Sequence, residues 1–136
     1  MSKKFWFAVA AYVLPTFPLG YSWHLSTFKA EYDALNMYRP DVIIPLGLAS
    51  MMVQGIAFAY LYPKLFSTAR ADWLTSAVKF FAIFGVLAWS FVVLPVAAKY
   101  NMTSVPKFFA LETAFTAIQY AIVAPLIALA WRDARS

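Results

Sequence analysis

The residue best placed to do chemistry is an acid that interrupts the last apolar stretch of the chain. Glu112 lies about 9 Å inside the segment that begins at Pro106, at 1.5 Å of rise per helical residue. A carboxyl group at membrane depth is costly, so it marks a site that carries a proton, binds a cationic ligand or ligates a metal. The alternative is a structural pair near the outer interface with Lys99, Lys107 or His24. The sequence leaves both interpretations open.

His24 is the only histidine, and an imidazole suits proton exchange near neutral pH. Together with Glu31, Asp33 and Glu112 it could offer an imidazole and carboxylates to zinc or iron, which would make a membrane metal or redox protein. However, the chain lacks the HxxxH and ExxH spacings of helical metal sites and has no cysteine. We therefore predict no resident metal and no cofactor.

Two glutamines are predicted to share a depth near the middle of the membrane. Gln54 and Gln119 each lie thirteen residues after the start of their apolar segments, which run in the same direction. The plain interpretation is an amide pair between two helices, worth about 1 kcal/mol. The alternative is a polar cavity for a small ligand, lined by both amides with Ser50, Ser90 and Thr116.

The motifs of common enzymes are missing from this sequence. No nucleophile stands beside a base, and there is neither a glycine-rich phosphate loop nor a pair of catalytic carboxylates. We therefore predict that the chain is not an enzyme.

The composition is that of a chain surrounded by lipid. Of its 136 residues, 63% are hydrophobic and 12% are charged, which is about half the charged share of a soluble domain. Four runs approach or exceed the roughly 20 apolar residues that cross a membrane, at residues 5–28, 42–63, 80–98 and 108–131. This pattern excludes a soluble enzyme, a nucleic-acid-binding domain and a disordered chain.

We predict an all-α membrane protein with a single domain over residues 1–136. Its four transmembrane helices are expected in one bundle, at about residues 5–25, 41–62, 74–98 and 106–131. Between the first two, apolar side chains recur every three or four residues over residues 25–38. That spacing predicts a short amphipathic helix lying flat in the outer interface.

Small residues mark the faces through which these helices are expected to pack. In the last span six alanines alternate at spacings of four and three, a period typical of left-handed helix packing: Ala110, Ala114, Ala117, Ala121, Ala124 and Ala128. The second span carries Gly47 and Ser50 on a similar stripe. Roughly opposite the alanines lie Glu112, Thr116 and Gln119. Because two of its faces are unsuited to lipid, the last span is predicted to be the central helix or to contact a second protein chain.

The basic residues predict the orientation. With a cytoplasmic N-terminus, the inner side holds Lys3, Lys4, Lys64, Arg70, Lys79, Arg132 and Arg135. The outer side then holds only Lys29, Arg39, Lys99 and Lys107. Because an excess of Lys and Arg marks cytoplasmic loops, both termini are predicted to lie in the cytoplasm. The net charge of +5 is thus a topology signal, and no nucleic-acid partner is expected.

Several segments resemble an uncharacterised family of small four-span bacterial inner-membrane proteins, known only as a domain of unknown function. They are residues 23–29 (WHLSTFK), 31–33 (EYD), 44–47 (IPLG) and 54–63, which begins QG and ends YLYP. Residues 109–114 (FALETA) are similar to the start of that family's last helix. The resemblance covers nearly the whole chain and implies a helical bundle in the bacterial inner membrane, without an activity or a functional residue.

Three functional classes remain open on the sequence. The two non-lipid faces of the last span favour a non-catalytic accessory or structural subunit of a larger membrane assembly. Its partners would be membrane lipids and a protein partner or second copy that docks on the last helix. The first alternative is a small-molecule binder or proton-coupled carrier that uses Glu112. The second is a membrane redox or metal protein that uses His24.

Overall fold

The computed structural model describes residues 1–133, which form helices and connecting turns without a strand. The long helical segments are α1 (Lys3–Ser22), α3 (Ile44–Leu65), the continuous run of α4 (Trp73–Phe80), η3 (Phe81–Gly85) and α5 (Val86–Lys99), and α6 (Val105–Trp131). The shorter elements are η1 (Trp23–Thr27), α2 (Lys29–Ala34) and η2 (Arg70–Asp72). Arg135, one of the residues that orient the chain, lies outside the described residues.

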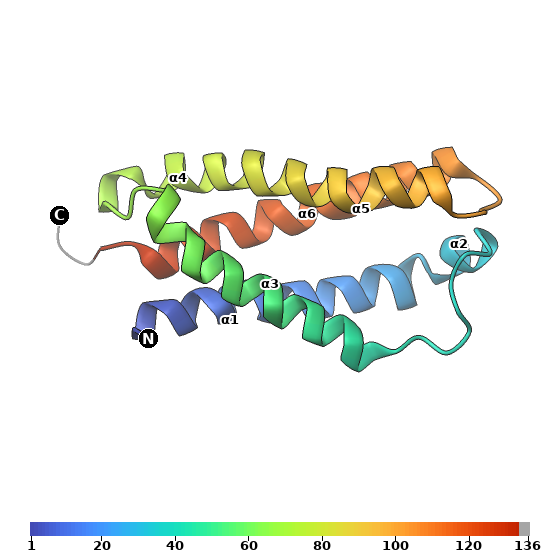
Figure 1. Ribbon diagram of the computed structural model, residues 1–136, viewed down its shortest axis with the longest axis horizontal. Coiled ribbons are helices and arrows are strands. Elements are labelled where there is room, and N and C mark those ends of the chain that lie inside the picture. The colour runs from blue at the N-terminus through green and yellow to red at the C-terminus, as the bar shows by residue number, and fades with distance from the viewer. Residues whose placement is uncertain (134–136) are drawn as a thin grey trace.

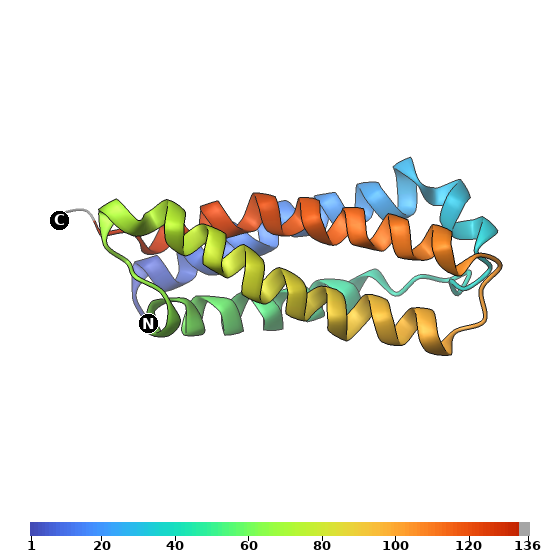
Figure 2. The same cartoon turned by 90° about the horizontal axis from the view of Figure 1, so that it is seen from above.

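The long helices lie side by side along the long axis of the molecule (Figure 1). The start of α1 and the end of α6 lie at one end, which we call the terminal end, and α2 lies at the other, the α2 end (Figures 1 and 2). Helix α6 packs against α1, α3, α4, η3 and α5, and its largest contact is with α1. It is therefore the central helix of the structure.

Three helices of the described chain are long and apolar enough to cross a membrane. They are α3, the segment Arg70–Lys99 and α6. Helix α1 also has 20 residues, but it begins with Lys3 and Lys4, contains two prolines and is not one of the three. The predicted all-helical fold is confirmed, and three of the four predicted spans are helices both long and apolar enough to cross a membrane.

Local signals in the sequence explain where the helices begin. The hydroxyl of Ser2 accepts a hydrogen bond from the Phe5 N–H at 3.3 Å and caps α1. Ser104 caps α6 in the same way through the N–H of Lys107. A proline in the first turn starts both α3 and α6, where its missing N–H costs nothing.

The segment between α1 and α3 differs from the flat interfacial helix predicted over residues 25–38. Its regular helix, α2, has six residues, and the chain turns at Asn36, whose positive φ of 54° ends the helical path. Tyr32 and Leu35 are fully buried in a cluster with Val93 of α5 and Phe108 of α6. The apolar side chains of this segment therefore pack it against the α2 end of the helices, where it forms a cap.

Among the glycines, the tightest approach of a neighbouring helix is at Gly55 and not at Gly47, the glycine of the predicted packing stripe. A Cβ added at Gly55 of α3 would lie 3.1 Å from Cγ2 of Val13 and 3.4 Å from the Val9 carbonyl oxygen. By contrast, Gly47 and Ser50 are exposed, and a Cβ at Gly47 would meet nothing within 4 Å. Residues 41–50 are exposed throughout, so the first turns of α3 stand away from the packed core.

The alanine row of α6 is only partly used within the chain. Ala124 and Ala128 are buried in the main core near the terminal end, alongside Tyr62, Phe80 and Ile127. The other four, Ala110, Ala114, Ala117 and Ala121, are exposed. Toward the α2 end, α6 thus has a row of small side chains that no other helix of the chain covers.

Candidate functional site

The candidate site lies between α1 and α6. On α1 and the turn after it, Tyr12, Thr16, Gly20 and His24 follow one another at steps of four, which places them on one face of the helix. His24 belongs to η1, a turn of π-helix that follows α1 directly. Such widened turns occur frequently at functional sites. The facing residues on α6 include Glu112, to which His24 is hydrogen-bonded.

His24 is half-buried and Glu112 is buried, and their side chains form a pair. Nε2 of His24 lies 2.9 Å from Oε1 of Glu112, and Nδ1 lies 2.9 Å from the carbonyl oxygen of Gly20. The imidazole packs between the rings of Tyr32 and Phe115, with centroids 4.8 and 4.6 Å away. Of the partners proposed for Glu112, the structure thus selects His24 and leaves Lys99 and Lys107 exposed.

This geometry fixes how many protons the pair holds. A carbonyl oxygen only accepts hydrogen bonds, so Nδ1 of His24 carries a proton and donates it to Gly20. The contact between Nε2 and Oε1 then needs one further proton, because otherwise two lone pairs would face each other. Whether that proton sits on His24 or on Glu112, the pair has no net charge.

Tyr32 of α2 completes the group. Its hydroxyl donates to Oε1 of Glu112 at 2.5 Å and accepts from the indole N–H of Trp23 at 3.2 Å. Burial, and next the neighbouring Glu112, raise the pKa of Tyr32 far above its ordinary value. Burial and Glu112 also raise the pKa of Tyr38, whose ring stacks on Tyr32 at 5.2 Å. Both phenols therefore stay protonated, and Tyr32 acts as a fixed donor.

The two glutamines are linked through a third residue instead of pairing directly. The hydroxyl of Tyr12 donates to Oε1 of Gln54, and Nε2 of Gln119 donates to the same hydroxyl at 3.1 Å. Gln54 also donates from Nε2 to Ser50 at 3.1 Å. The predicted amide pair is therefore a chain of hydrogen bonds across α3, α1 and α6, with Tyr12 at its centre.

These side chains line a cavity of about 550 Å³ between α3 and α5, with α1 and α6 behind it. Its polar lining consists of Tyr12, Thr16, Ser50, Gln54, Glu112, Thr116, Gln119 and Tyr120. Its aromatic walls include Phe58, Phe84, Phe91 and Phe115. Phe91 on α5 is 72% exposed, and Ser50 and Gln54 on α3 are exposed, so the cavity opens sideways between these two helices.

One hydroxyl in this cavity has no partner. Thr16 is only 2% exposed, and its Oγ1 makes no hydrogen bond within residues 1–133. Thr116, by contrast, donates to the Glu112 carbonyl of its own helix at 2.8 Å. Buried polar groups are normally paired, so the Thr16 hydroxyl, whose oxygen is itself fully buried, is an exception among the polar groups of this region.

Ser90, the fifth residue predicted for this cavity, does not line it. Its hydroxyl donates to the Leu87 carbonyl of its own helix at 3.0 Å, as serine in a helix commonly does. Four of the five predicted side chains, Ser50, Gln54, Thr116 and Gln119, do line it.

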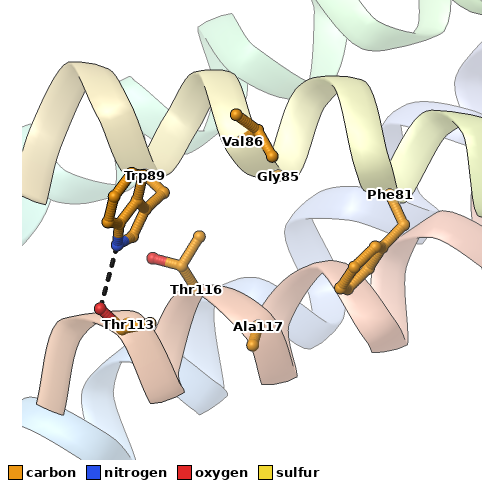
Figure 3. A pocket seen from close by; sticks show the side chains of 7 residues that line it. All are labelled: Phe81, Gly85, Val86, Trp89, Thr113, Thr116 and Ala117. Carbon is orange, nitrogen blue, oxygen red and sulfur yellow. Dashed lines mark hydrogen bonds between the residues drawn. The ribbon is translucent and has the colours of Figure 1, made fainter. Parts of the chain in front are cut away.

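A smaller groove of about 150 Å³ lies between the η3–α5 segment and α6 (Figure 3). Phe81, Gly85 and Trp89 form one wall, and Thr113 and Ala117 belong to the other (Figure 3). The indole N–H of Trp89 donates to Oγ1 of Thr113 at 3.0 Å. Its indole N–H and hydroxyl groups are already hydrogen-bonded within the protein, so this groove offers mainly apolar surface.

The four residues weighed as metal ligands are not brought together. Of His24, Glu31, Asp33 and Glu112, only His24 and Glu112 are in contact, and Asp33 pairs with Lys29 instead. Within residues 1–133, no three His, Asp or Glu side chains are close enough to share a metal ion.

Three residues of the site were not predicted from the sequence: Tyr12, Thr16 and Tyr32. The four-residue spacing of Tyr12, Thr16, Gly20 and His24 was the available signal for the first two. No such signal exists for Tyr32, because its apolar spacing is equally typical of an interfacial tyrosine.

Searches of protein-family models, curated proteins and solved structures find no match for this chain. The fold and the site therefore define its class on their own: an all-helical protein with membrane-length helices and a polar cavity among them.

Proposed function

We propose that the chain is a small inner-membrane protein that binds an amphipathic molecule in the cavity between α3 and α5, with the His24–Glu112 pair as its proton-exchanging group. The observation that carries this proposal is that Glu112, only 7% exposed, lines a cavity of about 550 Å³ between helices long and apolar enough to cross a membrane. An acid at membrane depth is a functional site by default, and a cavity of this size is typical of small-ligand sites.

In this proposal α1 is the fourth span. It lies alongside α6, its most extensive neighbour, and α6 is long and apolar enough to cross the membrane. The excess of Lys and Arg at the terminal end favours a cytoplasmic position for that end and an outer position for the α2 end. The resemblance to small four-span bacterial proteins favours the bacterial inner membrane, with His24 and Glu112 in its outer half.

The lining indicates an amphipathic ligand. Aromatic and aliphatic side chains form most of the cavity wall, and the polar groups are gathered on α1, α6 and one face of α3. A ligand with a hydrocarbon body and one hydrogen-bonding end matches this division. Since the opening lies between two helices of membrane-spanning length, the ligand would arrive from the lipid phase.

The experiment is a binding titration on the purified protein in detergent, followed by native mass spectrometry. The probes are n-octylamine and 1-octanol, which share a hydrocarbon chain and differ in their polar end. We expect at least one of them to bind with a stoichiometry of one. Substitution Ala88→Phe would fill the cavity, of which Ala88 is a lining residue, and should abolish that binding.

The matched control is Ala98→Phe, which makes the same change at an exposed position of the same helix outside the cavity. It should leave binding unchanged. If neither probe binds the wild-type protein, or if Ala88→Phe binds as tightly as Ala98→Phe, the proposal is wrong.

The exposed alanines favour a second candidate function, that of an accessory subunit of a larger membrane assembly. Ala110, Ala114, Ala117 and Ala121 form a small-residue face of the kind through which membrane helices approach each other closely. A second copy or a protein partner on this face should then co-purify in stoichiometric amount in mild detergent. It should be lost in Ala114→Leu, and a strictly monomeric wild-type protein would contradict this role.

A further inference from the structure

We infer that the ligand of this cavity is a lipophilic amine in its protonated form, and that it displaces the single proton shared by His24 and Glu112. This inference rests on the proposed function and specifies its ligand class and its proton stoichiometry.

The protein uses the two carboxyl oxygens of Glu112 unequally. Both hydrogen bonds to its carboxyl group, from His24 and from Tyr32, are made by Oε1. Oε2 has no hydrogen bond or ion pair with any described residue, although Glu112 is buried and lines the cavity. One strong acceptor is therefore held in place by the protein while the other remains available to a donor in the cavity.

The cavity wall contains an acid and no basic residue. Glu112 is its only Asp, Glu, His, Lys or Arg residue, so nothing in the lining favours an anion. The wall also contains six aromatic rings, from Tyr12, Phe58, Phe84, Phe91, Phe115 and Tyr120. The electron-rich faces of such rings attract cations, particularly away from water.

The free oxygen of Glu112 favours a charged donor. An alkylammonium group carries three N–H donors and a positive charge. An alcohol can also donate one hydrogen bond to Oε2, but that bond lacks the charge assistance of an ammonium–carboxylate contact.

Charge balance then specifies the fate of the proton. The His24–Glu112 pair is neutral with one bridging proton, so adding an ammonium ion would leave a net positive charge inside the membrane, which is costly. If the bridging proton leaves for water, the products are a neutral imidazole protonated at Nδ1, a carboxylate and the bound ammonium. The contact between Nε2 and Oε1 then opens, because two lone pairs would otherwise face each other. One cation enters, one proton leaves, and the site remains neutral.

No other group in contact with the pair can supply this proton. Tyr32 and Tyr38 are the phenols on the α2 side, and both are held in the protonated form by burial. Trp23 carries a non-titrating indole, and Lys29 and Asp33 of α2 are exposed and pair with each other. The released proton is therefore the one between Nε2 of His24 and Oε1 of Glu112.

The test is isothermal titration calorimetry of the detergent-purified protein at neutral pH, in two buffers that differ in ionisation enthalpy. The probes are n-octylamine, which is protonated in solution, and 1-octanol. We expect the amine to bind more tightly than the alcohol, by about tenfold or more, as for a charge-assisted hydrogen bond. The buffer dependence should correspond to about one proton released per amine.

Two variants separate the parts of this inference. Glu112→Gln should reduce octylamine affinity by about tenfold or more and have little effect on octanol. His24→Gln should still bind the amine but release no proton. The control Glu31→Gln removes an acid outside the cavity and should behave like the wild type. Circular dichroism establishes that each variant is folded.

The possible failures are distinguishable. If octanol binds as tightly as octylamine, or if the amine binds without releasing a proton, the inference is wrong while the ligand-binding function stands. If neither probe binds the wild-type protein, the proposed function and this inference fail together. If Glu112→Gln binds octylamine as tightly as the wild type, Glu112 is not the cation-binding residue and the inference is overturned.

Discussion

His24 and Glu112 are 88 positions apart in the chain, and their side chains meet at 2.9 Å. The contact joins η1, which directly follows α1, to α6, and Tyr32 of the α2 cap donates to the same carboxyl oxygen. Side chains from η1 and α2 thus meet on one buried carboxyl group of α6. This convergence makes Glu112 a structural contact of the fold as well as the acid of the proposed site.

Tyr32→Phe should loosen the cap without changing its packing. The substitution keeps the buried ring but removes the hydroxyl that donates to Glu112 and accepts from Trp23. Loss of the hydrogen bond to Glu112, which also leaves the Trp23 indole N–H without its acceptor, predicts destabilisation by about 1–3 kcal/mol. Thermal unfolding in detergent, followed by circular dichroism, measures it. Tyr38→Phe is the matched control, because Tyr38 stacks on Tyr32 through its ring, and equal effects of the two changes would contradict the role of the Tyr32 hydroxyl.

Much of the fold could be predicted from the sequence because hydrophobic length and periodicity are local properties. The helical character of residues 44–65, 73–99 and 105–131 follows from uncharged runs bounded by prolines, serines and lysines. The glycine at the closest contact could not be chosen in this way. Gly47 and Gly55 occupy the same helix, and only the angle at which α3 crosses α1 decides which of them is approached.

For the candidate site, single residues could also be predicted from the sequence, but their contacts could not. Glu112, His24, Gln54, Gln119 and Thr116 could be singled out because polar groups are conspicuous in apolar segments. Their partners could not be assigned, because Tyr12, Thr16 and Tyr32 are residue types that membrane helices and interfaces tolerate without a special role. The link between the two glutamines through Tyr12 depends on three helices meeting at one depth, which no single segment encodes.

Gly55→Leu should destabilise the contact between α1 and α3. A Cβ at Gly55 already approaches Val13 to 3.1 Å, so a larger side chain would overpack this crossing, at a cost of about 1–3 kcal/mol. Gly47→Leu is the control on the same helix, where a Cβ meets nothing within 4 Å, and it should be neutral or slightly stabilising because leucine favours helix. Unfolding titrations in mixed detergent micelles compare the two. Equal tolerance of both changes would place the crossing elsewhere.

Acid should weaken the contact that joins the two ends of the described chain. Hydrogen bonds from Lys4 at 2.8 Å and from Thr68 at 3.0 Å lower the pKa of the exposed Asp133 carboxyl group. A lowered pKa means that the carboxylate stabilises the fold above the ordinary titration range of aspartate. That contribution is lost as the pH falls through the lower folded value.

The measurement is the difference in unfolding midpoint between the wild type and Asp133→Asn. It should be present at neutral pH and disappear in strong acid, where both side chains are neutral. The control is Asp41→Asn, in which an exposed acid at the α2 end pairs only with Arg39 two positions away. A difference for Asp133→Asn that persists unchanged in acid would show that the carboxylate charge has no part in this contact.

Thr16→Val should stabilise the protein and leave its binding of octylamine unchanged. Valine has nearly the same shape as threonine but lacks the buried hydroxyl, which has no hydrogen-bond partner within residues 1–133. Removing an unpaired buried polar group is expected to raise the free energy of unfolding of the ligand-free protein by about 1–3 kcal/mol. Because the hydroxyl oxygen is fully buried, a ligand in the cavity does not reach it, and the affinity for octylamine should not change. Thr116→Val is the control, since that hydroxyl bonds to its own helix and should contribute little to stability. Denaturant unfolding in detergent compares the two variants, and a Thr16→Val protein no more stable than Thr116→Val would show that the Thr16 hydroxyl does not destabilise the fold.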